Sequence, residues 1–420
     1  MLNRKRSLAW TVALASVFAL AVAATQVGQA QTFKVLYNFT GGQDGAAPYD
    51  GLTIDRTGNL YGTAAYGGQQ GPGCPSSGAN TGCGTVFKLA PVGSGWVLKP
   101  VYNFKGGDDV GNPGVGVVFG PDGALYGAAG IKGSCDIRAC GTVFSLKPPP
   151  AACRNALCSW NETILHHFTG QPDGSFPASR VVFDTAGNLY GSTLYGGGNG
   201  GYAGYGTIYE LTPENGGWIE SILYSFFYDL GWGPSGPLVL DAAGNLYGTS
   251  NYCGGNCYGT AWQLAPSQSG WTYSTLHSFN GYDGAEPDGL ISDSSGNLYG
   301  FTYGAVGNQS ATIYQLTPSN GGWTYSLVYD FGFEAFFSGL SVDAAGNLYG
   351  VNSGYPFGVG TIFKLTNSGG TWTYSDLHDF SGNDGESPYG AVVFDANGNL
   401  YGTTTAGGRH GYGVIFEITP

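Results

Sequence analysis

Short runs of apolar and polar residues recur along this chain, and four such runs make one unit. The first run is brief and apolar, as at 238–241, which suits an inner strand covered by its neighbours. An Asp-x-x-Gly-Asn turn follows, in which the Asp side chain can cap the turn while Gly supplies a positive φ. A second run then begins Leu-Tyr-Gly. Each unit is therefore predicted to start with a tight hairpin of two strands.

The third run alternates with period two, which predicts a partly exposed strand, and the fourth run is predicted to be an outer strand. The fourth run begins at a tryptophan and reaches, six residues later, a slot held by Tyr102, His166, Tyr224, His277, Tyr329 or His378. The penultimate position of the third run is polar in all seven copies: Lys88, Ser145, Glu210, Gln263, Gln315, Lys364 and Glu417.

The units repeat with a spacing of 50 to 65 residues, which is typical of propellers. The landmark tyrosine of the second run stands at Tyr61, Tyr126, Tyr190, Tyr247, Tyr299, Tyr349 and Tyr401. An isolated fourth-type run at 33–39 precedes them, and a third-type run at 413–418 ends the chain. We predict an all-β fold: one seven-bladed β-propeller of four-stranded antiparallel blades over residues 31–420, closed 3+1 because the N-terminal strand 33–39 completes the last blade.

The repeated phrases resemble those of a known family. Copies of D-x-x-G-N-L-Y-G-T, G-T-[IV]-[FY]-x-L-T-P and G-W-T-Y-S are similar to the GloVer repeats of choice-of-anchor tandem-repeat bacterial proteins. This resemblance covers nearly all of residues 31–420 and implies a secreted or surface-associated protein without an assigned activity. Family members often carry a C-terminal anchoring signal, whereas this sequence stops at Pro420 directly after a strand. A looser similarity to kelch propellers rests on Gly67-Gly68, Gly196-Gly197 and the tryptophans.

The first 30 residues have the features of an export signal, namely three cations, an apolar stretch and small residues at 28–30. We therefore expect a secreted protein, extracellular or periplasmic, that is not inserted in a membrane after the signal is cleaved. Lys and Arg number 15 against 28 Asp and Glu, for a formal net charge of −13. Such a charge opposes nucleic-acid binding, which needs a basic surface.

All eight cysteines have a close neighbour in sequence, and an even count in an exported chain predicts local disulfides. Zinc binding is the alternative, but neither a C-x2-C pair nor Cys/His clustering is present. The expected pairs are Cys74 with Cys83, Cys135 with Cys140, Cys153 with Cys158, and Cys253 with Cys257.

The loops between units repeat an Asp-Gly-x-x-Pro phrase, for which two interpretations are open. Carboxylates gathered around a channel mouth would attract a hard cation such as calcium. Alternatively, Asp-Gly is simply a turn that leads into the inner strand, and we favour this interpretation. The metal candidates are Asp44, Asp173, Asp283, Glu286, Asp384 and Glu386.

Departures from the repeat are more informative than the repeat itself. Aromatic residues in three long loops would suit recognition of a sugar or a peptide if they are exposed. The alternative is that these rings plug the channel or pack between blades. The ligand-binding candidates are Tyr228, Asp229, Trp232, Phe333, Phe336, Phe337, Tyr355 and Phe357.

The sequence identifies no reaction and no cofactor, with calcium left open. The histidines of the fourth run replace tyrosines of sister units, so we interpret them as structural. We predict a monomeric, non-catalytic binding scaffold for a glycan or protein ligand. The alternative is a carbohydrate-active hydrolase or lyase that uses clustered carboxylates, assisted or not by a metal.

Overall fold

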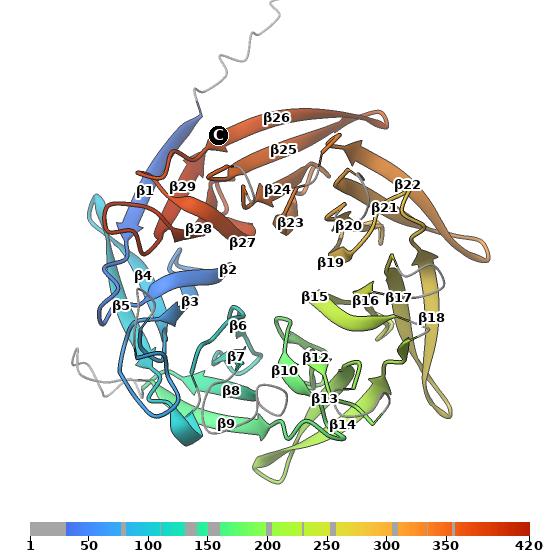
Figure 1. Cartoon of the computed structure of the whole chain (residues 1–420), viewed down its shortest axis with the longest axis horizontal. Helices are drawn as coiled ribbons and strands as arrows, with labels where there is room; N and C mark the ends of the chain where they lie inside the picture. The colour runs from blue at the N-terminus through green and yellow to red at the C-terminus, as the bar shows by residue number, and fades with distance from the viewer. Residues whose placement is uncertain are drawn as a thin grey trace, which may run out of the picture.

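The protein is a ring of β-sheets, as the repeat predicts (Figure 1). The computed structural model describes residues 31–76, 81–109, 111–130, 141–149, 160–198, 204–228, 231–252, 258–304, 310–333, 335–354 and 358–420. These residues form seven antiparallel sheets and one short 3-10 helix, η1 (Gly107–Asp109), and contain no α-helix. The predicted all-β, seven-bladed propeller is confirmed.

Each blade runs from the central channel outward (Figure 1). Blade 1 consists of β2 (Ala46–Ile54), β3 (Leu60–Tyr66), β4 (Thr85–Val92) and β5 (Gly95–Asn103). Blade 2 consists of β6 (Val118–Phe119), β7 (Leu125–Ala129), β8 (Thr142–Lys147) and β9 (Asn161–His167). Blade 3 consists of β10 (Ser175–Pro177), β11 (Val182–Phe183), β12 (Leu189–Tyr195), β13 (Thr207–Glu214) and β14 (Gly217–Ser225), where β10 and β11 both pair with β12.

The remaining blades follow the same order. Blade 4 consists of β15 (Trp232–Leu240), β16 (Leu246–Tyr252), β17 (Thr260–Ser267) and β18 (Gly270–Ser278). Blade 5 consists of β19 (Pro287–Ser292), β20 (Leu298–Thr302), β21 (Thr312–Ser319) and β22 (Gly322–Asp330). Blade 6 consists of β23 (Phe337–Val342), β24 (Leu348–Asn352), β25 (Thr361–Ser368) and β26 (Thr371–Asp379). Blade 7 consists of β27 (Glu386–Phe394), β28 (Leu400–Ala406), β29 (Val414–Thr419) and β1 (Thr32–Asn38).

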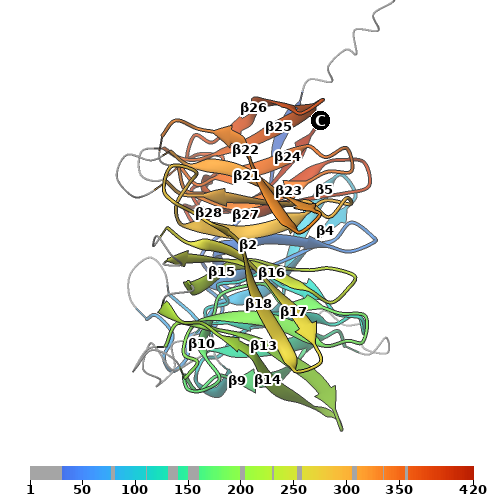
Figure 2. The ribbon, with the colours of Figure 1, turned by 90° about the vertical axis from the view of Figure 1, so that its right-hand side faces the viewer.

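The two ends of the described chain meet in blade 7. Strand β1 pairs antiparallel with β29, from Thr32 opposite Thr419 to Asn38 opposite Val414. Seen from the side, the blades form a disk, and the outer hairpins such as β13–β14 project from it (Figure 2). The expected export signal at 1–30 lies outside the described residues. Among the described residues, no helix is long and apolar enough to cross a membrane.

The Asp-x-x-Gly-Asn phrase forms the turn between the first two strands of a blade. In blade 1, Asp55 Oδ1 accepts hydrogen bonds from the backbone nitrogens of Thr57 at 2.8 Å and Asn59 at 3.0 Å. Asp55 Oδ2 accepts from Asn59 Nδ2 at 2.7 Å and from the Tyr61 hydroxyl at 3.2 Å. Burial alone would raise the pKa of Asp55, but the hydrogen bonds from Asn59 and Thr57 outweigh it and lower this pKa to about 2.

The Leu-Tyr-Gly phrase is explained by packing. The tyrosine faces the polar slot of the third strand: Tyr190 donates a 2.9 Å hydrogen bond to Glu210. The following glycine makes room for an aromatic ring of that strand. A Cβ added at Gly350 would lie 2.0 Å from Phe363 Cζ, and one added at Gly248 would lie 2.4 Å from the Trp262 ring. These glycines are required for space rather than for a left-handed backbone.

The hydrophobic core is divided among the seven seams between blades. One cluster, for example, joins Tyr247 and Ala261 of blade 4 to Leu298 and Tyr314 of blade 5. The third strands are buried over their first five residues apart from the half-buried polar slot, so this slot marks the tyrosine contact rather than an exposed face. Stability therefore comes mainly from the packing of blade on blade, as expected for a ring of repeats.

One of the four expected disulfides falls within the described residues. Cys74 and Cys83 are bonded, with their Cα atoms 5.0 Å apart, in the loop between β3 and β4. The pairs Cys135–Cys140, Cys153–Cys158 and Cys253–Cys257 lie outside the described residues and stay predictions.

Candidate functional site

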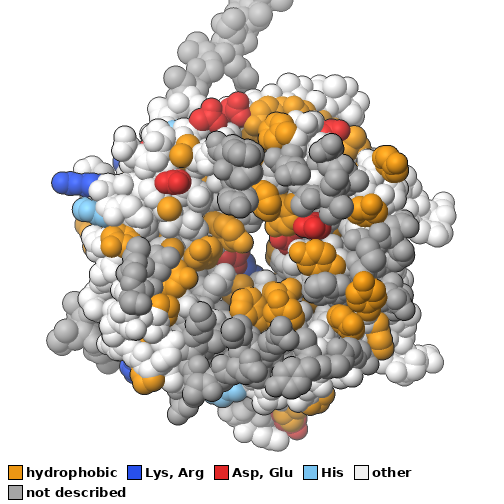
Figure 3. Space-filling model, viewed as in Figure 1, with side chains coloured by type: hydrophobic (Ala, Val, Ile, Leu, Met, Phe, Trp, Pro, Cys, Tyr) orange, Lys and Arg blue, Asp and Glu red, His pale blue; other side chains and the backbone are white. Residues whose placement is uncertain are grey.

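A cavity of about 470 Å³ occupies the central channel. Hydrophobic side chains surround the channel opening, and acidic and basic side chains are visible inside it (Figure 3). Every blade contributes its innermost segment to the lining. One lining residue from each blade, in order from blade 1 to blade 7, is Asp50, Val115, Arg180, Ser235, Asp288, Ser338 and Tyr389. The cavity is therefore a joint product of all seven repeats.

Irregular inner strands bring these side chains to the channel. The register of β2 against β3 shifts between Tyr49 and Thr53, and Asp50 within this shift has a φ of 61°. A positive φ is uncommon for a residue other than glycine, and such backbone outliers cluster at functional sites. Where blades approach one another, a Cβ added at Gly236 would lie 2.4 Å from Gly289. The inner strands are thus bent at the channel rather than flat.

Arg180 and Asp50 form an ion pair across the channel wall. Arg180 Nε donates to Asp50 Oδ2 at 2.9 Å, and the Gly116 nitrogen donates to the same oxygen at 2.6 Å. The two side chains come from blades 3 and 1, and Arg180 passes over blade 2. A Cβ at Gly116 would lie 2.6 Å from Arg180 Nη2, so glycine leaves space for the guanidinium group. Nη2 itself is buried and has no hydrogen-bond partner.

Asp288 is the second carboxylate of the cavity. The Tyr303 hydroxyl donates a hydrogen bond to its Oδ2, while its Oδ1 is buried without a partner. Burial raises the pKa of Asp288 and outweighs the hydrogen bond from Tyr303, which lowers it, while the negative charge of Asp50 adds to the rise. The cavity therefore holds one carboxylate paired with arginine and one whose pKa is raised by burial.

Tyr389 supplies an aromatic wall. Its surface is 39% exposed, and it lines the cavity. The ring packs edge-on against Tyr49, with the centroids 5.2 Å apart. Burial raises the pKa of Tyr389, and the charges of Asp288 and Asp50 add to this effect, so the phenol stays neutral at physiological pH.

The four Asp-Gly aspartates cap their own loops. Asp44, Asp283 and Asp384 each accept a hydrogen bond from a backbone nitrogen three or four residues earlier, at 2.8 to 2.9 Å. Each of the four also contacts the Tyr or His slot of an outer strand: Tyr37, His277, His378 and, for Asp173, His166. None of these four carboxylates lines the described central cavity.

The two glutamates of the predicted metal set lie in the inner segments of blades 5 and 7. Glu286 has a φ of 53°, and burial raises its pKa. Glu386 is exposed and pairs with Ala406 at the start of β27. A calcium site formed by these carboxylates stays a prediction.

The aromatic candidates separate into exposed and packed residues. Tyr228 and Phe333 are more than half exposed. Phe336 packs on Tyr303, with the ring centroids 5.4 Å apart, and Phe337 is buried between blades 5 and 6. The backbone of Trp232 begins β15 opposite Tyr252. Outside the description lie the Trp232 side chain and the whole of Asp229, Tyr355 and Phe357.

Sequence reasoning did not find Asp50, Arg180, Asp288 or Tyr389. The available signal was a charged or aromatic residue near the start of the apolar inner run, where several other units carry small residues. Nothing in the sequence showed that these positions face one another across a channel.

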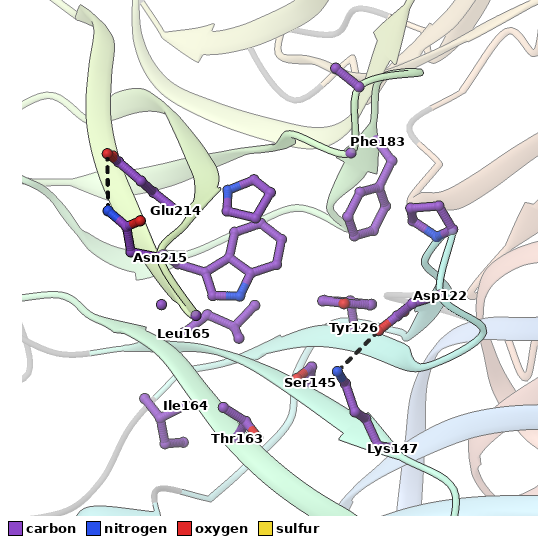
Figure 4. Close-up of a pocket in the computed structure, with 17 residues that line it drawn as sticks. Asp122, Tyr126, Ser145, Lys147, Thr163, Ile164, Leu165, Phe183, Glu214 and Asn215 are labelled. Atoms are coloured by element: carbon purple, nitrogen blue, oxygen red, sulfur yellow. Dashed lines mark hydrogen bonds and ion pairs between the residues drawn. The ribbon is translucent and has the colours of Figure 1, made fainter.

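A second hollow, of about 780 Å³, lies between blades 2 and 3 (Figure 4). The Trp218 ring packs on Tyr126 at 6.1 Å, and Lys147 forms a 3.4 Å ion pair with Asp122 at the edge. The same Trp-on-Tyr contact recurs at other seams, so we attribute it to the repeat and assign the hollow no ligand: Trp96 on Tyr401, Trp160 on Tyr61, Trp271 on Tyr190, Trp323 on Tyr247 and Trp372 on Tyr299.

A protonated carboxyl group is expected at the seam between blades 1 and 2. The Tyr102 oxygen lies 2.6 Å from Asp109 Oδ1 and 2.7 Å from Glu162 Oε2, and one hydroxyl proton can serve only one of them. Burial raises the pKa of Glu162; Asp109 raises it further, whereas Tyr102 and Lys105 lower it. A raised pKa means that this carboxyl stabilises the fold at low pH and that the stabilisation is lost as pH rises through the folded-state pKa.

We therefore predict that Glu162→Gln makes the protein more stable than the wild type at pH 8 to 9 and flattens the decline of stability between pH 5 and pH 9. Urea unfolding across this range measures the effect. Glu214→Gln, a change at an exposed hairpin, is the control and should leave the slope unchanged. An equal slope in wild type and Glu162→Gln would contradict the prediction.

One solved structure, with a TM-score just above 0.5, supports the fold. A candidate 6-phosphogluconolactonase of Bacteroides fragilis matches with a TM-score of 0.51 and 15% identity over 79% of this chain and 86% of its own. A protein of unknown function from Dyadobacter fermentans matches with a TM-score of 0.44 and 13% identity over 92% and 98%, respectively. A candidate glucose dehydrogenase of Thermus thermophilus matches with a TM-score of 0.44 and 14% identity over 72% and 95%. At these identities the likeness concerns the fold alone.

Sequence comparison identifies the family. No curated protein matches this chain. The family model of the Gloeobacter/Verrucomicrobia repeat matches residues 156–350 and, overlapping them, residues 272–420. These matches cover blades 3 to 7 almost completely, and blades 1 and 2 repeat the same phrases. The chain belongs to the Gloeobacter/Verrucomicrobia repeat family.

Proposed function

We propose that this protein binds a sugar-sized, polyhydroxylated group, such as the end of a glycan, in its central cavity without transforming it. The observation that carries the proposal is that Arg180 Nη2 and Asp288 Oδ1 are both buried at the cavity without a hydrogen-bond partner. A buried polar group left unpaired costs about 1–3 kcal/mol, and a charged one costs more. A ligand that satisfies both atoms would recover this free energy.

Hydroxyl groups suit this pair of atoms. A sugar hydroxyl can accept a hydrogen bond from the Arg180 guanidinium and donate one to the Asp288 carboxyl group. The exposed face of Tyr389 would contact the apolar C–H face of a sugar ring. The cavity volume of about 470 Å³ lies within the range of small-ligand sites, which is about 300–1,000 Å³.

A protein ligand is the second binding candidate, and the exposed rings of Tyr228 and Phe333 favour it. Both residues lie in loops between blades, where a larger partner could contact them. Such loops are common positions for binding residues on a rigid scaffold.

A carbohydrate-active hydrolase or lyase is the alternative of another class. The observation that favours it is the pair of carboxylates, since Asp288 has a raised pKa while Asp50 is paired with Arg180. Two carboxyl groups whose environments differ in this way are suited to acid and base roles.

An extracellular or periplasmic location accompanies the proposal. It is supported by the signal-like segment at 1–30, by the Cys74–Cys83 disulfide and by the secreted character that the repeat family implies. A monomeric state and calcium binding stay predictions.

To test the proposal, residues 31–420 are titrated with neutral monosaccharides, uronic acids and short oligosaccharides. Binding is measured by calorimetry and by thermal melting. A ligand that binds only the folded state raises the melting temperature. We expect Asp288→Asn to weaken binding at least tenfold, because the amide at this position no longer presents two acceptor oxygens. The matched control is Asp330→Asn on the exposed end of β22, which should bind normally.

Two outcomes separate the candidates. Undiminished glycan affinity in Asp288→Asn, in a variant that melts normally, would place binding elsewhere and overturn the channel site. Release of reducing ends, unsaturated sugars or acid during incubation would favour the enzymatic alternative.

A further inference from the structure

The outer seams between blades follow one contact rule. The side chain two residues after the tryptophan slot packs on the Tyr or His slot of the preceding blade. At four seams this contact is a stack of aromatic rings, with centroids 3.5 to 5.3 Å apart: Tyr224 with Tyr273, His277 with Tyr325, Tyr329 with Tyr374, and His378 with Phe33. At the seams of blades 1 and 2 and of blades 2 and 3, the stacking residue is replaced by Glu162 and Glu220.

The seam of blades 2 and 3 is different from the others because it combines an imidazole with two carboxylates. His166 Nε2 lies 3.2 Å from Asp173 Oδ2 and 3.9 Å from Glu220 Oε1. The three ligand atoms all lie within 4.8 Å of one another. They come from β9, from the loop between blades and from β14, so this cluster joins two blades.

The three side chains are largely buried, with 21%, 10% and 15% of the His166, Asp173 and Glu220 side chains exposed. Glu220 Oε1 is fully buried and accepts no hydrogen bond. No described lysine or arginine forms an ion pair with either carboxylate. Two acidic groups are thus held together with only one imidazole to offset them, which is costly unless a cation is present.

We propose that His166 Nε2, Asp173 Oδ2 and Glu220 Oε1 bind a divalent transition-metal ion, with Zn²⁺ as the best fit. Zinc is bound by histidine nitrogen and carboxylate oxygen at about 2.0–2.2 Å, so tetrahedral ligand atoms lie about 3.3–3.5 Å apart. The pair of His166 and Asp173 is already near this separation, whereas Glu220 has to move toward both, since its Oε1 lies 3.9 Å from His166 Nε2 and the three ligand atoms lie within 4.8 Å of one another. A fourth position remains for water.

The surrounding residues support this assignment over calcium. Calcium takes 6–8 oxygen ligands, whereas imidazole is a common ligand of zinc and of other late first-row transition metals. Thr169 orients Asp173, because its hydroxyl donates to Asp173 Oδ1 at 2.8 Å and its backbone nitrogen donates to Oδ2 at 3.0 Å. Ligating carboxylates in metal sites are commonly held by such outer hydrogen bonds. A bound ion would link the outer strands of blades 2 and 3.

Two other seams of the same ring are natural controls. The seam of Tyr102, Asp109 and Glu162 has two carboxylates but a phenol in place of the imidazole. The seam of His277 and Asp283 has an imidazole and a carboxylate but a tyrosine ring, Tyr325, in place of the glutamate. Each of these two seams lacks one of the three proposed ligands. Each therefore indicates a substitution that should abolish metal binding while the packing between the two blades is kept.

The experiment uses residues 31–420 after dialysis against a chelator, with ZnCl₂ and CoCl₂ as the probes. We expect one Zn²⁺ per chain by calorimetry and by elemental analysis, with a rise in melting temperature. Co²⁺ should give visible absorption of a four- or five-coordinate site. His166→Tyr and Glu220→Tyr copy the sister seams, so both should fold and both should lower the zinc affinity at least 100-fold.

His277→Tyr is the matched control and should bind zinc like the wild type. Unchanged zinc affinity in His166→Tyr and Glu220→Tyr would overturn the proposal and assign the ion to other surface groups. Absence of stoichiometric binding to the folded wild-type protein would overturn it as well. Because His166, Asp173 and Glu220 lie outside the central cavity, these results are independent of the glycan titration.

Discussion

Replacing Arg180 with methionine is expected to lower the free energy of unfolding by about 3 kcal/mol. The substitution leaves Asp50 in the channel wall with only the Gly116 nitrogen as a donor, and removing one partner of a buried ion pair leaves an uncompensated charge. The side chains of Arg180 and Asp50 are 19% and 24% exposed, which places the expected loss at the lower end of the range for buried pairs. Urea unfolding of residues 31–420 measures it.

The pairing itself is tested by a double mutant. Asp50→Asn added to Arg180→Met removes the orphaned charge, so the double variant should be more stable than Arg180→Met alone. Asparagine also tolerates the positive φ at this position. Arg56→Met, at an exposed turn, is the control and should change stability by less than about 0.5 kcal/mol. Equal losses for Arg180→Met and Arg56→Met would contradict the importance of the pair.

Gly350→Ala is expected to cost about 3 kcal/mol, because the new methyl group would overlap the ring of Phe363, whose Cζ lies 2.0 Å from the added Cβ. The backbone of Gly350 is not left-handed, so the cost should come from crowding between β24 and β25. Chemical or thermal unfolding measures the change.

The control for crowding is Gly95→Ala at the start of β5, where an added Cβ meets only Val92 O at 3.9 Å. This variant should be as stable as the wild type or slightly more stable. Combining Gly350→Ala with Phe363→Leu relieves the overlap, so the double variant should lose less than the sum of the two single losses. Additive losses would show that the ring is not the cause.

Much of the fold could be predicted because its signals are local. The Asp55 turn is made by residues four positions apart, and the Leu-Tyr-Gly phrase fits the strand beside it. Seven copies of such a unit leave few arrangements other than a closed ring. The replacement of tyrosine by histidine in the fourth run was also visible in the sequence, although the contact of His277 with Asp283 was not predicted.

The sites were harder to predict because their members are distant in sequence. Arg180 and Asp50 are 130 positions apart, and a shifted register in β2 together with the ring geometry brings them into contact. The aromatic loop candidates show the same difficulty, since Phe333 is exposed whereas nearby Phe337 is buried between two blades. Periodicity indicates that a residue is in a loop or a strand, but not which neighbouring blade its side chain meets.

By itself, then, the sequence determined the blade, its turns, the number of repeats and the family, because hydrogen bonds and packing within one repeat depend on residues close in the chain. Only the tertiary structure decided that Asp50, Arg180, Asp288 and Tyr389 share a cavity and that His166 faces Glu220 across a seam. Such contacts depend on the bends of the inner strands and on the closure of the ring. Those features place residues from different repeats within a few ångströms of one another.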